Sequence, residues 1–160
     1  MQSILRVTSL DLKEDWIDLL ETGVYPRSRV NFGKVYSDFV SNLPQNTGCV
    51  TSFLGVSRKE SADASKTTRA LVIESYKTHA DKVLRKICNE TKLKYALNDI
   101  KIVHALGSFK PGEPIVLVAV SSPRRDVAFK ALREAVERYK KEPALFKKEI
   151  YFDGSGAWIS

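Results

Sequence analysis

The chain has 160 residues, 43% of them hydrophobic and 28% charged, which is ordinary for a single globular domain over 1–160 that buries its own core. No apolar run approaches the ~20 residues of a membrane-spanning helix, so the sequence excludes a protein of that type. The formal net charge of +7 suits three kinds of partner: nucleic acid, an acidic protein or a phosphorylated small molecule.

The N-terminal residues, MQSILRVTSLDLKEDW, show no basic start, no sustained apolar run and no small-residue cleavage site. We therefore expect no secretory signal. Cys49 and Cys88 lack both metal-ligand spacing and a disulfide-rich context, and we interpret them as buried free thiols in a reducing compartment. These features predict a cytoplasmic protein that contacts no membrane.

The first third of the chain is the hardest part to interpret. A strand is predicted over 4–9, and apolar residues at helical spacing predict a helix over 11–21. Residues 22–47 contain two prolines and two glycines, and only a short helix over 36–43 is indicated there.

Two strands with a polar segment between them follow. The strands are predicted over 48–57 and 69–76, and the small, polar residues 59–68 (KESADASKTT) predict a mobile loop. This arrangement suggests one long hairpin. A helix is then predicted from Thr78, with Asp81 completing a capping box in which Asp replaces the usual Glu.

The second half continues the alternation of strands and helices. A strand is predicted over 100–106, and residues 114–120 (PIVLVAV) are nearly all apolar, which is typical of a buried central strand. Ser122 as N-cap and Pro123 at the first helical position predict the start of the last helix. This helix should end near Lys141, since the proline two residues later disfavours helix at the residue before it.

Positive charge accumulates around this last helix. Arg124 and Arg125 lie in its first turn, where the helix dipole disfavours cations, and this placement suggests binding of an anion at the free N–H groups. A final strand is predicted over 145–152, and alternation turns one of Lys147 and Lys148 inward and the other outward. An inward lysine needs an anionic partner or a lowered pKa, and both are common at active sites.

Other residue patterns point to no further chemistry. His79 and His104 are far apart and show no metal-site spacing, and we interpret them as core or surface residues. No Ser/His/Asp arrangement, GxGxxG or phosphate loop is present, so we expect neither a metal nor a cofactor. The basic residues are not interleaved with aromatic residues as in a single-strand binder, which makes nucleic acid a weak alternative.

From residue 48 to residue 158 the chain carries an ordered set of short motifs. The most specific feature is a pair of lysines seven residues apart, Lys140 and Lys147, the second of them inside Phe-Lys-Lys-Glu. The further matching segments, in order, are FLGVSR at 53–58, VIESY at 72–76, HALG at 104–107, PGEPIVLVAVSS at 111–122, RDVAF at 125–129 and the terminal Trp158. This ordered set resembles the catalytic, large subunit of molybdopterin synthase. Residues 22–47 match this family poorly and are interpreted as an insertion.

The resemblance implies a fold, a reaction and partners. The fold is α/β (α+β), a hammerhead-type domain with an additional antiparallel β subdomain. Members of this family are sulfurtransferases of molybdenum cofactor biosynthesis, which convert cyclic pyranopterin monophosphate into the dithiolene of molybdopterin. The sulfur comes from a small ubiquitin-like subunit with a C-terminal Gly-Gly thiocarboxylate, and two large subunits form the homodimer core of a heterotetramer.

By position, the resemblance also implies the site residues. Lys140 and Lys147 are the expected catalytic lysines. The expected substrate-binding residues are Arg58, Arg124, Arg125, Lys140, Lys147, Lys148 and Glu149.

Two departures from the family pattern keep alternatives open. Arg124 stands where the family usually has histidine, and Ala105 stands where it has arginine. These departures suggest a non-catalytic relative that keeps the fold and the partner, beside the active subunit. A basic nucleic-acid-binding module is the alternative from another class.

Overall fold

A computed structural model describes residues 20–159. The strand predicted over 4–9 lies outside the described residues, as does the helix predicted over 11–21 apart from Leu20 and Glu21, which are not helical. No helix within residues 20–159 is long and apolar enough to cross a membrane.

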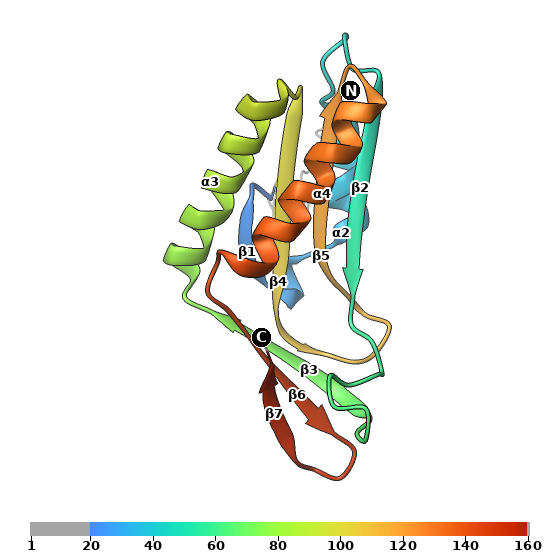
Figure 1. Ribbon diagram of the computed structural model, residues 1–160, viewed down its shortest axis with the longest axis vertical. Helices are drawn as coiled ribbons and strands as arrows, with labels where there is room; N and C mark the ends of the chain where they lie inside the picture. Colours follow the sequence, from blue (N-terminus) through green and yellow to red (C-terminus); the bar gives the residue numbers. More distant parts are fainter. Residues whose placement is uncertain (1–19, 160) are drawn as a thin grey trace, which may run out of the picture.

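A mixed seven-stranded sheet forms the centre of the molecule (Figure 1). Six of its strands run in the order β2 (Cys49–Val56), β5 (Pro114–Ser122), β4 (Asp99–Phe109), β3 (Thr68–Ser75), β6 (Leu145–Tyr151) and β7 (Gly156–Ile159). The seventh, β1 (Gly23–Pro26), pairs in parallel with β4.

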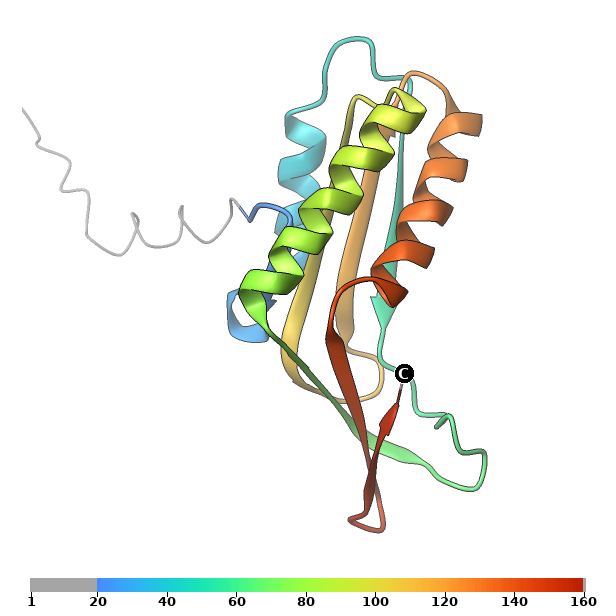
Figure 2. The same cartoon turned by 60° about the vertical axis from the view of Figure 1, so that its left-hand side comes forward.

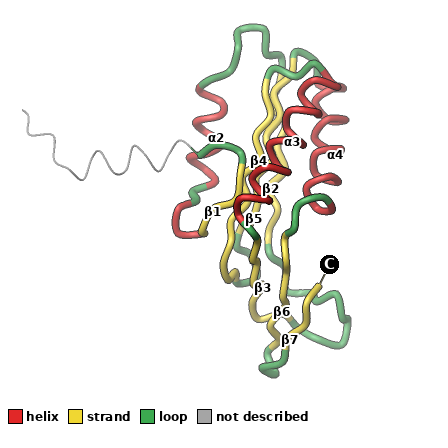
Figure 3. The backbone as a smooth tube through the Cα atoms, turned by 90° about the vertical axis from the view of Figure 1, so that its left-hand side faces the viewer, coloured by secondary structure: helices red, strands yellow, loops and turns green. Residues whose placement is uncertain are grey.

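Helices cover both faces of the upper part of this sheet. Figure 3 shows α2 (Phe32–Ser41) on one side, and α3 (Lys77–Tyr95) and α4 (Arg125–Lys141) on the other. Because both faces are covered, β5 is buried along almost its whole length, as its apolar sequence predicts. Three alanines let α4 lie close against the sheet: Ala128, Ala131 and Ala135.

Strand β4 connects the upper sheet to a smaller one below it. Residues 99–104 of β4 pair with β5, whereas Gly107, Ser108 and Phe109 pair with β3. Gly107 has φ +131°, a backbone conformation that favours glycine, and the Arg27 side chain packs 3.3 Å from where a Cβ would lie. Strands β3, β6 and β7 therefore extend below the ends of α3 and α4 (Figure 2). The predicted α+β class with an added antiparallel part is confirmed.

The strands predicted over 48–57 and 69–76 exist, but the long hairpin was wrong. Strand β2 pairs with β5, and β3 pairs with β4 and β6. Ser57 exchanges backbone hydrogen bonds with Gly112 and Glu113, at 2.7 and 2.9 Å, and these direct the chain away from β2 toward the lower sheet. Strand patterns predict strands but not their partners.

Both predicted helix starts were also wrong. Helix α3 begins at Lys77, and Asp81 accepts a hydrogen bond from the Val24 backbone N–H at 2.8 Å, so it ties β1 to α3 instead of capping the helix. Ser122 lies in β5, and its hydroxyl accepts from the N–H of Arg124, the N-cap of α4, at 3.2 Å.

Residues 22–47, interpreted from the sequence as an insertion, belong to the body of the domain. Val24 of β1 is fully buried. On the other face of the sheet, Val35 of α2 packs into a small core with Leu20, Val103 and Leu117. The short helix predicted over 36–43 is the second half of α2.

Candidate active site

The end of α4 and the start of β6 bring two lysines together. The Lys140 ammonium lies 5.7 Å from the centre of the Phe53 ring. Burial, and then the charge of Lys140, lower the pKa of Lys147 below its ordinary value. The two cations thus repel each other, an arrangement that is costly unless an anion offsets their charge.

Aromatic side chains surround the lysine pair. Tyr139, the residue before Lys140, has its ring 6.4 Å from that of Phe53 and 6.0 Å from that of His104. Burial raises the pKa of Tyr139 to about 12, so its hydroxyl stays protonated. We call Phe53, His104, Tyr139, Lys140 and Lys147 the lysine pocket.

The register of β6 separates the two consecutive lysines. Lys147 is paired with Ile73, which is 1% exposed, and therefore shares the face of the lower sheet that is turned toward the core. Lys148 lies on the opposite face, with its ammonium 5.6 Å from the Trp158 ring. The structure thus does not bring Lys148 into the lysine pocket.

Glu149 shares the face of Lys147, but its carboxylate is already occupied. The side chain is 6% exposed. It accepts hydrogen bonds from the Ser61 hydroxyl at 2.5 Å, the Tyr151 hydroxyl at 3.1 Å and the Ala62 N–H at 3.4 Å. Glu149 therefore fastens the loop over 59–68 to β6. The mobility predicted for this loop stays a prediction.

This attachment makes Glu149 a stability determinant. Glu149→Gln removes the charge from hydrogen bonds that are nearly buried, and we expect a loss of about 1.5 kcal/mol in the free energy of unfolding, measured by urea denaturation. The matched control is Glu60→Gln, an exposed residue of the same loop, which should change stability by less than about 0.5 kcal/mol. Equal effects of both variants would contradict the attachment.

The predicted arginines do not lie together. Arg58 is exposed two residues after the end of β2, at the same end as Lys140. Arg124 and Arg125 are exposed at the start of α4, and Arg124 pairs with Asp126 at 3.3 Å. A helical rise of about 1.5 Å per residue puts Arg125 roughly 22 Å from Lys140. One chain therefore does not bring all the predicted cations together.

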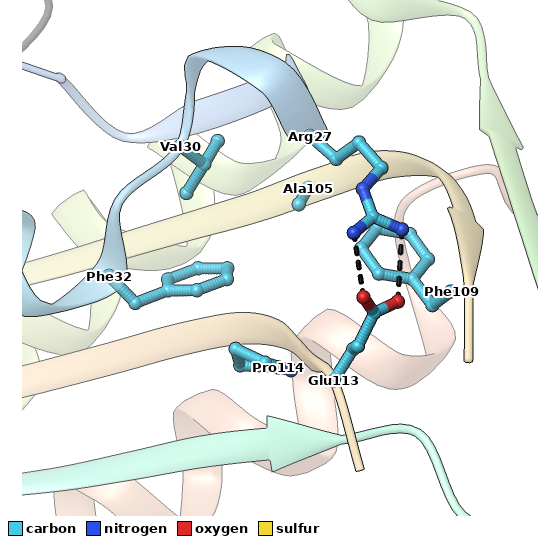
Figure 4. A pocket seen from close by; sticks show the side chains of 7 residues that line it. All are labelled: Arg27, Val30, Phe32, Ala105, Phe109, Glu113 and Pro114. Atoms are coloured by element: carbon cyan, nitrogen blue, oxygen red, sulfur yellow. Dashed lines mark hydrogen bonds and ion pairs between the residues drawn. The ribbon is translucent and has the colours of Figure 1, made fainter. Parts of the chain in front are cut away.

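Ala105, the second departure from the family pattern, lies outside the lysine pocket. It lines a cavity of about 120 Å³ beside Val30 and Phe32 (Figure 4). The same cavity is closed by the ion pair of Arg27 with Glu113 at 2.9 Å. Successive residues of a strand point to opposite faces, so Ala105 faces α2 while His104 faces α4.

Sequence patterns did not single out Phe53, His104 or Tyr139 as site residues. Tyr139 continues the apolar stripe of α4, and Phe53 sits in an apolar strand, so both look like core positions. Within residues 20–159, no group of three or more His, Cys, Asp or Glu side chains could hold a metal ion.

Comparison with known proteins identifies the family of this fold. The family model described as MoaE protein matches residues 27–142. The molybdopterin synthase catalytic subunit of Rhizobium meliloti is 35% identical over 114 residues, which cover 71% of each chain. The crystal structure of molybdopterin synthase from Staphylococcus aureus superposes with a TM-score of 0.78 at 29% identity, over 89% of this chain and 98% of that one.

A more distant structure shows a likeness of fold alone. It is the complex of subunits 1 and 2 of the molybdopterin-converting factor from Helicobacter pylori, at 18% identity and a TM-score of 0.66. It covers 89% of this chain and 90% of that one.

Fold and family match together define a small α+β enzyme subunit. The chain belongs to the MoaE family, the sulfurtransferases that form the catalytic subunit of molybdopterin synthase in molybdenum cofactor biosynthesis. Because the chain belongs to this family, we no longer consider the alternative of a nucleic-acid-binding module.

Proposed function

We propose that the lysine pocket is where sulfur passes from the C-terminal Gly-Gly thiocarboxylate of a small ubiquitin-like subunit to cyclic pyranopterin monophosphate. The observation that carries this proposal is Lys147, an ammonium withdrawn from water beside a second lysine and without an acidic partner among residues 20–159. Such a site is suited to an anion supplied from outside the chain.

The charges of the two reactants explain why two lysines are needed. The pterin carries a cyclic phosphate and the partner a thiocarboxylate, so two anions must approach each other. Fixed cations offset their repulsion and stabilise negative charge that develops during transfer. We assign Lys147 to activation of the pterin, since its lowered pKa also suits it to moving a proton or holding an acyl group. We assign Lys140 to the thiocarboxylate carbonyl.

The arginines at the start of α4 can join this site only from a second copy of the chain. Arg125 lies roughly 22 Å from Lys140 along its own helix. We propose a two-fold homodimer in which the start of one α4 lies beside the lysine pocket of the other subunit. We therefore propose that Arg58 acts in its own subunit and that Arg124 and Arg125 bind the phosphate across the dimer, with one small subunit at each end of a heterotetramer.

We favour an active subunit over a non-catalytic relative. Ala105 faces α2, away from the lysine pocket, so the missing arginine removes no charge from it. Arg124 keeps a cation where the family usually has histidine. The free thiols of Cys49 and Cys88 are consistent with a reaction in the cytoplasm.

The small subunit provides the test of the sulfur source. Deleting its terminal Gly-Gly should weaken binding to this chain and abolish turnover, because the tail then cannot place its carboxyl end at Lys140. Binding is measured by calorimetry, and turnover by the dithiolene product. Equal turnover with the truncated partner would contradict the thiocarboxylate route.

A further inference from the structure

His104 occupies an unusual position at the base of the lysine pocket. It lies in β4, is 0% exposed, and its ring is 6.0 Å from that of Tyr139. Its Nδ1 is 3.0 Å from the carbonyl oxygen of Ala105. A carbonyl oxygen only accepts hydrogen bonds, so Nδ1 must carry the proton, and Nε2 is left with a lone pair.

That lone pair has no protein partner. Nε2 of His104 is buried and forms no hydrogen bond with any of residues 20–159. A buried acceptor is rarely left unpaired, and one beside a functional site needs an explanation. Burial, with the Lys147 charge adding to it, lowers the pKa of His104 to about 4, so the ring stays neutral and Nε2 stays an acceptor at physiological pH.

The complementary donor lies in the same pocket. Lys147 forms no ion pair with residues 20–159. It pairs with Ile73 of β3, which on its other side pairs with Gly107, three residues after His104 in β4, and its charge acts on His104. Lys140 is the other cation here, but its ammonium lies over Phe53. A lysine side chain has a flexible four-carbon stem, so its ammonium can turn toward a fixed acceptor.

We propose that His104 is a positioning residue whose Nε2 accepts a hydrogen bond from the Lys147 ammonium and so fixes that cation where the two anionic reactants meet. The use of this position rests on the proposed function of the pocket. The hydrogen bond itself does not, and it can be tested without turnover.

The test compares the pKa of Lys147 in variants that keep or remove the acceptor. His104→Phe keeps a ring beside Tyr139 but has no lone pair. His104→Gln restores an oxygen near the Nε2 position. Each pKa is read by NMR from selectively labelled lysine side chains, and the Lys147 signal is assigned by its loss in Lys147→Arg.

Loss of the acceptor should lower the pKa of Lys147 by about one unit, because the charged form loses its hydrogen bond. His104→Gln should stay within about 0.3 units of the unaltered chain. The matched control is Thr91→Val, which removes another buried side-chain oxygen without a partner, near the far end of α3, and should leave Lys147 unchanged. The Lys148 signal is an internal reference.

An unchanged pKa of Lys147 in His104→Phe would overturn the proposal. Where that variant does not fold, as judged by its thermal melt, His104→Asn replaces it, since Asn keeps a donor near Ala105 but places no acceptor at Nε2. Turnover then separates the two claims. A lowered pKa with kcat reduced about tenfold at constant KM supports both, whereas a lowered pKa with unchanged kcat keeps the hydrogen bond and contradicts its role in positioning Lys147 for the reaction.

Discussion

Lys147→Ala is expected to reduce the single-turnover rate of sulfur transfer by about 10²–10³, the usual effect of removing a preorganised charge from a developing anion. Fold, dimer and partner binding should stay intact, since the Lys147 ammonium makes no ion pair with residues 20–159. Thermal melts and size-exclusion chromatography verify the folded state before rates are compared.

The neighbouring lysine supplies the matched control. Lys148→Ala removes the same charge one residue away, but this side chain lies over Trp158 on the opposite face of β6. We expect its rate to fall less than about threefold. A large loss in Lys148→Ala with none in Lys147→Ala would show that the wrong face of the strand has been assigned to the reaction.

The second large effect concerns Arg125. Arg125→Ala should raise KM for the pterin about 10–100-fold, through loss of a charge-assisted contact to the phosphate worth ~1.5–3 kcal/mol. Because Arg125 and Lys140 lie roughly 22 Å apart in one chain, this loss should occur in the site of the other subunit.

Mixed dimers separate action across the dimer from action within one chain. Arg125→Ala and Lys147→Ala chains carrying different affinity tags are combined, and the heterodimer is purified. If Arg125 acts across the dimer, one site keeps both residues and the heterodimer recovers about half of the unaltered activity. If Arg125 acts within its own chain, one site lacks Arg125 and the other lacks Lys147, so the heterodimer keeps the raised KM of Arg125→Ala instead of recovering the unaltered KM, which would contradict the two-fold arrangement.

Local patterns predicted the strands and helices of this chain better than their connections. The apolar run at 114–120 needs cover on both faces, and it became the buried strand β5. The predicted hairpin is wrong because β2 pairs with β5, and this pairing is decided by packing between distant segments of the chain. Asp81 looked like a capping residue, but the backbone N–H of Val24, 57 residues away, accounts for its position.

In the site, too, the sequence predicted residues better than their contacts. Strand alternation together with the resemblance singled out Lys147, and the structure places it beside Lys140. Lys148 and Glu149 follow it in sequence. The Glu149 carboxylate is hydrogen-bonded to the loop over 59–68, and Lys148 lies over Trp158 on the opposite face of β6. His104 could not be recognised from the sequence, because its significance depends on an unpaired nitrogen that only three-dimensional packing produces.

The central claim is that this chain transfers sulfur at the lysine pocket, and product formation tests it most directly. The chain is mixed with a thiocarboxylated small subunit and cyclic pyranopterin monophosphate, and the dithiolene of molybdopterin is measured in a single turnover. Dithiolene should form with the unaltered chain and be nearly lost in Lys147→Ala. An unaltered, folded chain that binds the small subunit but forms no dithiolene would contradict it.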